Sequence, residues 1–170
     1  SIMRINPIGN AQFVADIEDV DLQAISTDDF EKIYQAWLHF GVIRIRNQSL
    51  DDTALQRFSA RFGPLEEIPL GRMSKQDREK IPNIYVTVLS NIRINGKAIG
   101  GLGNAEASWH SDMTYVDTPP PASVLLGIEI PPVGGDTYFA DQAAAYAALP
   151  ESLRQRISDL SIKHDAAHTS

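Results

Sequence analysis

The sequence predicts a mixed α and β fold, in which helices decorate a β-sheet scaffold. Segments with helical apolar periodicity cluster early and late in the chain, and short runs of strand-like composition lie between them. These helices and strands do not alternate regularly, which argues against a repeated βαβ architecture. With 170 residues, of which 43% are hydrophobic and 22% charged, the chain has the composition of an ordinary globular domain. We therefore expect a single domain over residues 1–170.

The first predicted elements are a helix and the strand that follows it. Residues 26–40 have apolar side chains at i, i+3, i+4 and i+7, which is the stripe of a helix lying on a core. Ser26 suits the N-cap of this helix and Gly41 suits its end. Residues 42–46 alternate between apolar and polar, as expected of a strand with one buried face.

A second helix is expected from Ser49 to Gly63, because Ser49 and Asp52 have capping-box-like spacing. Residues 64–81 are rich in proline and charge, and we expect a surface loop there. The remaining predicted elements are a strand at 84–89, a tight turn at Asn95-Gly96, a strand at 123–130 that returns as a hairpin at 137–139, and helices at 142–149 and from Pro150.

Charge and cysteine content exclude several classes of function. Fifteen Lys and Arg against 22 Asp and Glu give a net charge of −7, which argues against nucleic acid or an anionic membrane as the main partner. The absence of cysteine excludes disulfides, thiolate metal sites and thiol nucleophiles. The first residues lack the hydrophobic region of a signal peptide, and no apolar run is long enough for a membrane span. We expect a cytoplasmic protein.

One of the four histidines stands out by its neighbours, in Trp109-His110-Ser111-Asp112. If this segment is a strand, His110 and Asp112 point to the same face and both reach one ion. Two histidines and one carboxylate with open positions are typical of non-heme Fe(II) oxygenases. The alternative is a structural histidine, because a single His-x-Asp triplet is a weak motif.

The order of the following motifs supports the metal interpretation. They are Trp109-His110-Ser111-Asp112, Thr118-Pro119-Pro120 and Pro131-Pro132-Val133-Gly134-Gly135-Asp136-Thr137. In this order the chain resembles the Fe(II)/2-oxoglutarate-dependent dioxygenases of the taurine dioxygenase and 2,4-dichlorophenoxyacetate dioxygenase family. The resemblance covers nearly the whole chain and is strongest over residues 109–149. It implies a double-stranded β-helix, or jelly roll, with the ligands at the barrel mouth.

The resemblance also implies roles for individual residues. His110 and Asp112 look like the first two iron ligands, and Thr137 looks like the hydroxyl that binds a carboxylate of 2-oxoglutarate. The expected cofactor set is Fe(II), 2-oxoglutarate as cosubstrate, and O2. The implied reaction hydroxylates an aliphatic C–H bond of a small molecule and releases succinate and CO2.

Two residues that the family requires are not found in this chain. They are a second histidine ligand and an arginine that pairs with 2-oxoglutarate, both expected well downstream of His110. We expect His164 and His168 to be structural or surface residues, and His39 to lie on a helix surface. The 170 residues are therefore expected to lack the C-terminal part of the dioxygenase domain, which leaves activity of this piece alone in doubt.

Two positions bear on the substrate. Ile68 and Glu106 stand where taurine dioxygenase has a histidine and an asparagine that hold the sulfonate, so taurine is disfavoured. Glu106 near the iron would repel an anion, which favours an amine-bearing or less anionic small molecule. We expect a homo-oligomer as the assembly. The alternatives are a non-catalytic binding or structural module of the same fold and a cupin-like metal hydrolase.

Overall fold

The computed structural model describes all residues except 1, 69, 72, 104–107, 166 and 168–170. The chain divides into two units, and each is described by itself. The first consists of Ser1–His110 and Pro120–Leu126, and the second of Ser111–Pro119 and Gly127–Ser170.

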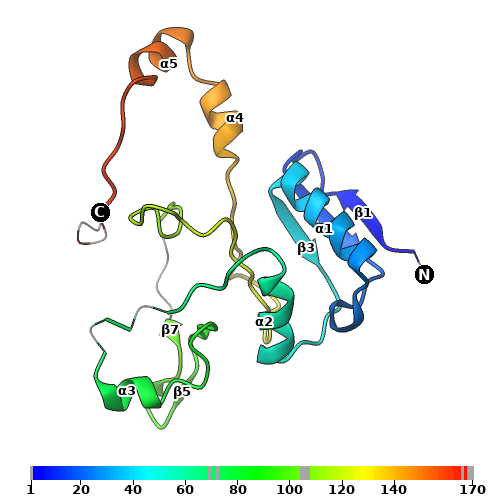
Figure 1. Cartoon of the computed structure of the whole chain (residues 1–170), viewed down its shortest axis with the longest axis vertical. Helices are drawn as coiled ribbons and strands as arrows, with labels where there is room; N and C mark the ends of the chain where they lie inside the picture. The colour runs from blue at the N-terminus through cyan, green and yellow to red at the C-terminus, as the bar shows by residue number, and fades with distance from the viewer. Residues whose placement is uncertain (1, 69, 72, 104–107, 166, 168–170) are drawn as a thin grey trace. The chain divides into compact units, whose positions relative to one another are not determined.

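The first unit contains a three-stranded sheet in the order β1-β2-β3. The strands are β1 (Arg4–Pro7), β2 (Val14–Glu18) and β3 (Val42–Ile45). β2 pairs antiparallel with β1 and parallel with β3, and the connection between β2 and β3 runs through the short helix η1 (Leu22–Ala24) and the helix α1 (Thr27–Phe40). Figure 1 shows α1 lying along this sheet. The mixed α and β class is thus confirmed, with one βαβ unit that the sequence analysis did not predict.

Local capping sets both ends of α1. The Ser26 hydroxyl accepts a hydrogen bond from the Asp29 backbone N–H at 3.1 Å, which satisfies one of the unpaired donors at the helix start. Gly41 has φ +93°, and its N–H donates to the Trp37 carbonyl at 2.7 Å. Glycine suits this position because other residues pay a steric cost for positive φ. The predicted helix at 26–40 and the strand after it are confirmed.

Removing the Ser26 cap is expected to cost about 1 kcal/mol in the free energy of unfolding. In Ser26→Ala the Asp29 N–H loses its side-chain acceptor, whereas Ser26→Asp supplies another one. Urea unfolding of the two variants measures the difference. Equal stability of the alanine and aspartate variants would contradict a capping role for Ser26.

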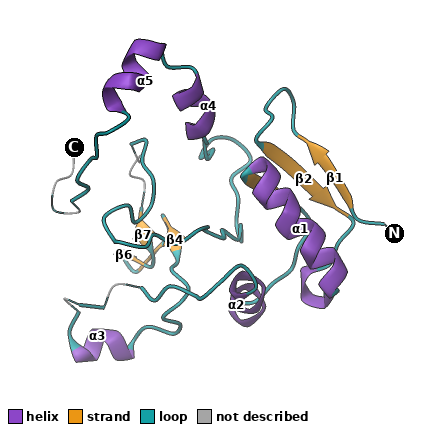
Figure 2. Cartoon of the chain, turned by 45° about the horizontal axis from the view of Figure 1, so that its top comes forward, coloured by secondary structure: helices purple, strands orange, loops and turns teal. Residues whose placement is uncertain are grey.

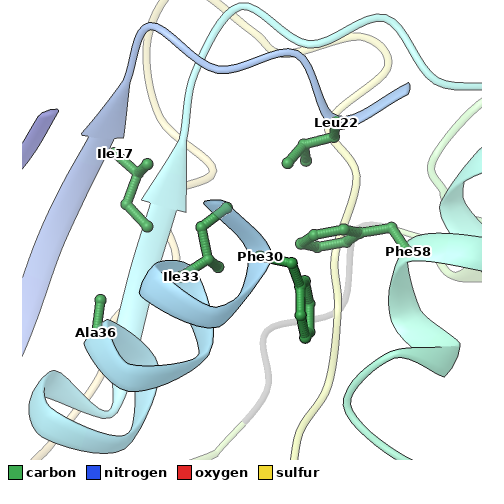
Figure 3. Close-up of a cluster of buried hydrophobic side chains, with 6 residues drawn as sticks. All are labelled: Ile17, Leu22, Phe30, Ile33, Ala36 and Phe58. Atoms are coloured by element: carbon green, nitrogen blue, oxygen red, sulfur yellow. The ribbon is translucent and has the colours of Figure 1, made fainter. Parts of the chain in front are cut away.

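The core of this unit lies between α1 and the sheet. Ile17 of β2 and Ile33 of α1 are both 0% exposed, and Figure 3 shows them facing each other. Strand alternation places Ile17 on the face that α1 covers and puts Asp16 on the other face. The buried cluster consists of Ile17, Leu22, Phe30, Ile33, Ala36 and Phe58.

The helix α2 (Asp52–Ala60) extends this core with aromatic side chains. Phe58 lies edge-on to Phe30 with ring centroids 6.0 Å apart, and Phe62 lies 5.2 Å from Phe30 in a similar geometry. The helix was predicted to start near Ser49, but Asp51 is the N-cap, and its carboxylate accepts from the Ala54 N–H at 2.7 Å. The N-cap is thus Asp51 in place of Ser49, and an aspartate caps a helix as well as a serine does.

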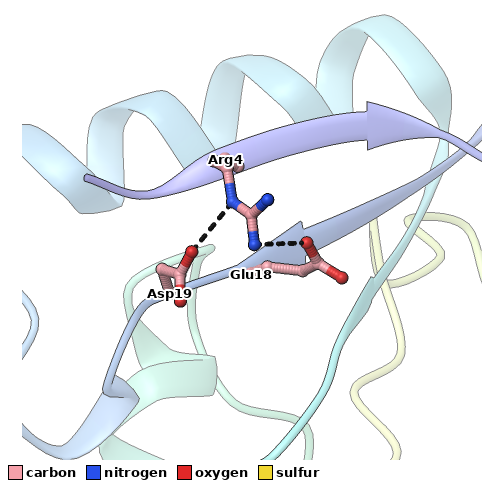
Figure 4. A network of polar contacts seen from close by, with 3 residues as sticks. All are labelled: Arg4, Glu18 and Asp19. Carbon is pink, nitrogen blue, oxygen red and sulfur yellow. Dashed lines mark hydrogen bonds and ion pairs between the residues drawn. The ribbon is translucent and has the colours of Figure 1, made fainter. Parts of the chain in front are cut away.

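The uncovered face of the sheet carries ion pairs. Asp16 and Arg44 are directly opposite in the β2–β3 register and form a two-pronged pair, with Nε–Oδ1 at 2.6 Å and Nη2–Oδ2 at 2.8 Å. The hydrogen bonds from Arg44 hold the pKa of Asp16 below its usual value. Nearby, Arg4 contacts Asp19 at 2.8 Å and Glu18 at 3.0 Å, as Figure 4 shows.

The Asp16–Arg44 pair is expected to make stability depend on acid pH. Because the folded state lowers the pKa of Asp16, its contribution is present above the pKa in the unfolded chain and is lost as the pH falls through the folded pKa. The contribution is about 0.5 to 1 kcal/mol, since the Arg44 side chain is 49% exposed and solvent screens the pair. Urea unfolding at pH 7 and pH 2 should show a smaller pH effect in Asp16→Asn. An equal pH effect in both proteins would contradict this role.

The rest of the first unit contains four short strands and a short helix. The strands β4 (Leu89–Ser90) and β7 (Gly101–Leu102) pair in parallel, and β5 (Arg93–Ile94) and β6 (Lys97–Ala98) form a hairpin. Asn95 and Gly96 connect this hairpin with φ +51° and +77°, which confirms the predicted tight turn. The region expected to be a loop at 64–81 contains the helix α3 (Lys75–Glu79), which Ser74 caps.

The second unit contains the helices α4 (Gln142–Ala147) and α5 (Glu151–Ile157), both near their predicted positions. No described helix in the chain has the length and apolar character to cross a membrane.

The predicted strands at 123–130 and 137–139 are wrong for this structure, and so is most of the strand at 84–89. Figure 2 draws the stretch that leads directly into α4 as loop. A strand exists only where a second strand pairs with its backbone, and none does so here among the described residues. The apolar side chains remain exposed, at 86% for Ile128 and 73% for Ile130. The described residues therefore do not form the expected jelly roll.

Candidate functional site

His110 is an exposed side chain in an irregular segment at the end of the first unit. Its Nδ1 lies 2.6 Å from the Ser108 carbonyl oxygen. A carbonyl can only accept a hydrogen bond, so Nδ1 carries the proton, and in the neutral ring Nε2 carries the lone pair. A metal-ligating histidine commonly has this arrangement, in which a backbone carbonyl fixes the tautomer.

Asp112 is also exposed and begins a turn in the second unit. The Val116 N–H donates to the Met113 carbonyl at 3.3 Å, and Met113 has φ +52°. Residues 109–112 are not a strand, so strand alternation does not supply the common face that we expected for His110 and Asp112. His110 belongs to the first unit and Asp112 to the second.

Thr137 lies in the second unit in an exposed stretch without helix or strand. It follows Gly134 and Gly135, which have φ +80° and +71°, and Gly134 lies in a bend. The predicted hairpin between 123–130 and 137–139 does not form, because the described residues there contain no strand.

The other histidines have different surroundings. The Nδ1 atom of His164 lies 2.9 Å from the Thr114 hydroxyl oxygen, and both residues belong to the second unit. His39 is exposed on α1, with its ring edge-on to Phe40 at 4.7 Å, as expected for a helix-surface residue. His168 lies outside the described residues. Thr114 was not singled out from the sequence, because its partner is 50 positions away and no local pattern connects them.

Of the two positions considered for the substrate, the structure describes only Ile68. Its side chain is half-buried, and its N–H donates to the Ile84 carbonyl at 2.8 Å. This hydrogen bond ties the loop at 64–81 to the segment before β4. Glu106 lies outside the described residues.

The donor set at His110 and Asp112 fits a divalent iron by its chemistry. An imidazole nitrogen and a carboxylate are borderline and hard ligands, which suit Fe(II). Within the part of the chain that the structure describes, no three His, Asp or Glu side chains are grouped to hold a metal ion. A three-ligand iron site built on His110 and Asp112 would therefore need a third ligand besides these two.

Comparisons with known proteins place the chain among relatives that are named as dioxygenases. It is 32% identical over 171 residues to the alpha-ketoglutarate-dependent 2,4-dichlorophenoxyacetate dioxygenase of Cupriavidus pinatubonensis, covering 96% of this chain and 58% of the relative. It is 33% identical over 135 residues to the alpha-ketoglutarate-dependent sulfate ester dioxygenase of Pseudomonas putida, covering 79% of this chain and 40% of the relative. The chain thus spans about half the length of the curated relatives that it matches.

A solved structure and a family match agree with these relatives. A crystal structure from Burkholderia xenovorans, described as an alpha-ketoglutarate-dependent taurine dioxygenase, is 26% identical with a TM-score of 0.64, covering 93% of this chain and 52% of the other. The family described as taurine catabolism dioxygenase TauD, TfdA family matches residues 4–170. The chain belongs to this family, which confirms the resemblance drawn from the motifs between residues 109 and 149.

Proposed function

We propose that the whole protein containing this chain is an Fe(II)- and 2-oxoglutarate-dependent dioxygenase that hydroxylates an aliphatic C–H bond of a small molecule. Succinate and CO2 are the co-products. The observation that carries this proposal is the His-x-Asp pair at 110–112 within a family match over residues 4–170. The hydrogen bond from His110 Nδ1 to the Ser108 carbonyl supports it. The names of the relatives, which are alpha-ketoglutarate-dependent dioxygenases, support it.

In this proposal His110 and Asp112 hold the iron. His110 binds through Nε2, because the Ser108 carbonyl keeps the proton on Nδ1. Asp112 adds a negative charge that favours a divalent cation. A histidine outside these 170 residues completes the set of three ligands. The bound iron would activate O2 for the coupled oxidation of 2-oxoglutarate and substrate.

Thr137 binds a carboxylate of 2-oxoglutarate through its hydroxyl. The exposed position of Thr137 after Gly134 and Gly135 supports this role, since an exposed hydroxyl is accessible to a ligand. Thr137→Val keeps the shape of the side chain and removes only this donor. An arginine beyond the described residues would pair with the other carboxylate.

The substrate of this proposal is a small molecule other than taurine. Ile68 cannot donate a hydrogen bond to a sulfonate through its side chain, and Glu106 would repel one. An amine-bearing or less anionic substrate suits both residues. Turnover compared between taurine and an uncharged or amine-bearing analogue tests this choice, and preference for taurine would overturn it.

The rest of the jelly roll is supplied by chain outside these 170 residues in the proposed whole protein. Two observations support this: the chain spans about half of its relatives, and its second unit exposes large apolar side chains. These include Ile128 at 86%, Ile130 at 73% and Tyr138 at 72%. In this proposal, chain outside these 170 residues covers this exposed apolar surface.

Succinate production tests the proposed reaction. The whole protein is incubated with Fe(II), 2-oxoglutarate, O2 and candidate substrates, and succinate is measured against 2-oxoglutarate consumed. We expect one succinate for each 2-oxoglutarate, in a reaction that requires both iron and O2. A metal hydrolase would convert substrate without forming succinate, and a non-catalytic module would leave 2-oxoglutarate unchanged. Either result would overturn the proposal.

We also propose a cytoplasmic location and a homo-oligomeric assembly. The absence of cysteine from the sequence suits a reducing compartment. Light scattering of the whole protein gives its molar mass, and a monomeric mass would rule out the homo-oligomer.

A further inference from the structure

The turn that carries Asp112 contains a backbone conformation that requires support. Met113, directly after Asp112, has φ +52°. For a residue other than glycine this left-handed conformation costs about 1 to 2 kcal/mol. Within the turn, the hydrogen bond from the Val116 N–H to the Met113 carbonyl is long, at 3.3 Å. A further contact to this turn, made from elsewhere in the chain, therefore adds to its stability.

Thr114 makes a contact of this long-range kind. Its hydroxyl oxygen lies 2.9 Å from Nδ1 of His164, a residue 50 positions later in the chain. The Thr114 side chain is half-buried and β-branched, so χ1 has few accessible rotamers. Fixing its hydroxyl therefore also fixes the backbone orientation at Thr114, two residues after Asp112.

One local hydrogen bond lies next to His164. The carboxylate of Asp165, the next residue, accepts a hydrogen bond from the Ala167 N–H at 2.9 Å. An aspartate that bonds to the backbone two residues later stabilises a turn. His164 itself is exposed and lies outside helix and strand, so its contact with Thr114 is the link between this segment and the turn at 112–116.

We infer that the Thr114–His164 hydrogen bond positions the Asp112 carboxylate for metal binding, which makes Thr114 and His164 positioning residues. This inference rests on the proposed function, because it assigns the support of one proposed iron ligand. Residues that orient metal ligands commonly change metal affinity by about 10- to 100-fold when they are replaced. His164 thereby acquires a role that does not require it to bind iron itself.

The test compares variants that remove the hydrogen bond with variants that keep it. Thr114→Val removes the hydroxyl and retains the β-branched shape, whereas Thr114→Ser retains the hydroxyl. His164→Ala removes the partner, whereas His164→Asn keeps a polar atom near the position of Nδ1. The whole protein is titrated anaerobically with Fe(II) in the presence of 2-oxoglutarate, and the visible charge-transfer absorbance of the complex is followed. Thermal unfolding of each metal-free variant is measured alongside.

We expect the half-saturating Fe(II) concentration to rise about 10-fold or more in Thr114→Val and in His164→Ala. The serine and asparagine variants should stay near the wild-type value, and the double variant Thr114→Val/His164→Ala should be no weaker than either single one. Wild-type Fe(II) affinity in Thr114→Val or His164→Ala would overturn the inference, even if the Tm falls. Should one of these variants fail to fold, the other still decides. An absent wild-type band would overturn the proposed function itself, so the two failures are distinguishable.

Discussion

In the whole protein, His110→Ala is expected to lower iron retention and 2-oxoglutarate turnover by at least about 100-fold. Replacing a residue that only supports a metal ligand already lowers metal affinity or activity by about 10- to 100-fold. Replacing the ligand itself has a larger effect. The alanine cannot supply the Nε2 lone pair of the tautomer in which the Ser108 carbonyl holds the proton on Nδ1. Metal analysis after gel filtration and succinate formation measure the two losses. Asp112→Ala should behave in the same way.

His39→Ala is the matched control for this prediction. His39 is also an exposed histidine, but it lies on α1 in the first unit and packs against Phe40. Its loss removes a basic residue from the last turn of the helix, which costs at most about 1 kcal/mol of stability. Iron content and turnover should remain at the wild-type level. If His110→Ala and His39→Ala bind equal amounts of iron, His110 is not a ligand.

The second large effect concerns the core, where Ile33→Ala is expected to lower the free energy of unfolding by about 2 to 5 kcal/mol. Ile33 is 0% exposed and packs against Ile17, which is also 0% exposed, so the removed atoms leave a cavity between α1 and β2. The higher helix propensity of alanine offsets only a few tenths of a kcal/mol. Urea unfolding monitored by circular dichroism measures the change.

Leu38→Ala on the same helix is the control for the core prediction. Leu38 is 56% exposed, so its truncation should change the free energy of unfolding by less than about 1 kcal/mol. The contrast separates loss of core packing from any general effect of alanine on α1. Similar losses in Ile33→Ala and Leu38→Ala would show that the sheet and α1 do not form the core described here.

Where the signal was local, the sequence predicted the fold well. Ser26 and Gly41 bracket α1 as expected, and Asn95-Gly96 forms the hairpin turn, because caps and tight turns depend on a few neighbouring residues. The strands β1 and β2 were not predicted. In β2 the alternation of buried Ala15 and Ile17 with polar neighbours was the available signal.

Strand predictions that depended on distant partners did not hold. Residues 123–130 have an apolar, β-branched composition, yet composition does not provide the neighbouring strand with which the backbone must pair. The same limit applies to the site. His110 and Asp112 were found from their spacing and from the family resemblance, whereas the contact between Thr114 and His164 is visible only in three dimensions.

We propose above that the whole protein binds Fe(II) and 2-oxoglutarate together at a site that includes His110 and Asp112. The most direct test of this proposal is anaerobic addition of Fe(II) and then 2-oxoglutarate to the whole wild-type protein, with absorbance recorded in the visible range. We expect a metal-to-ligand charge-transfer band that needs both components, saturates at one equivalent of iron and is lost in His110→Ala. No band in the whole protein, or an unchanged band in His110→Ala, would contradict it.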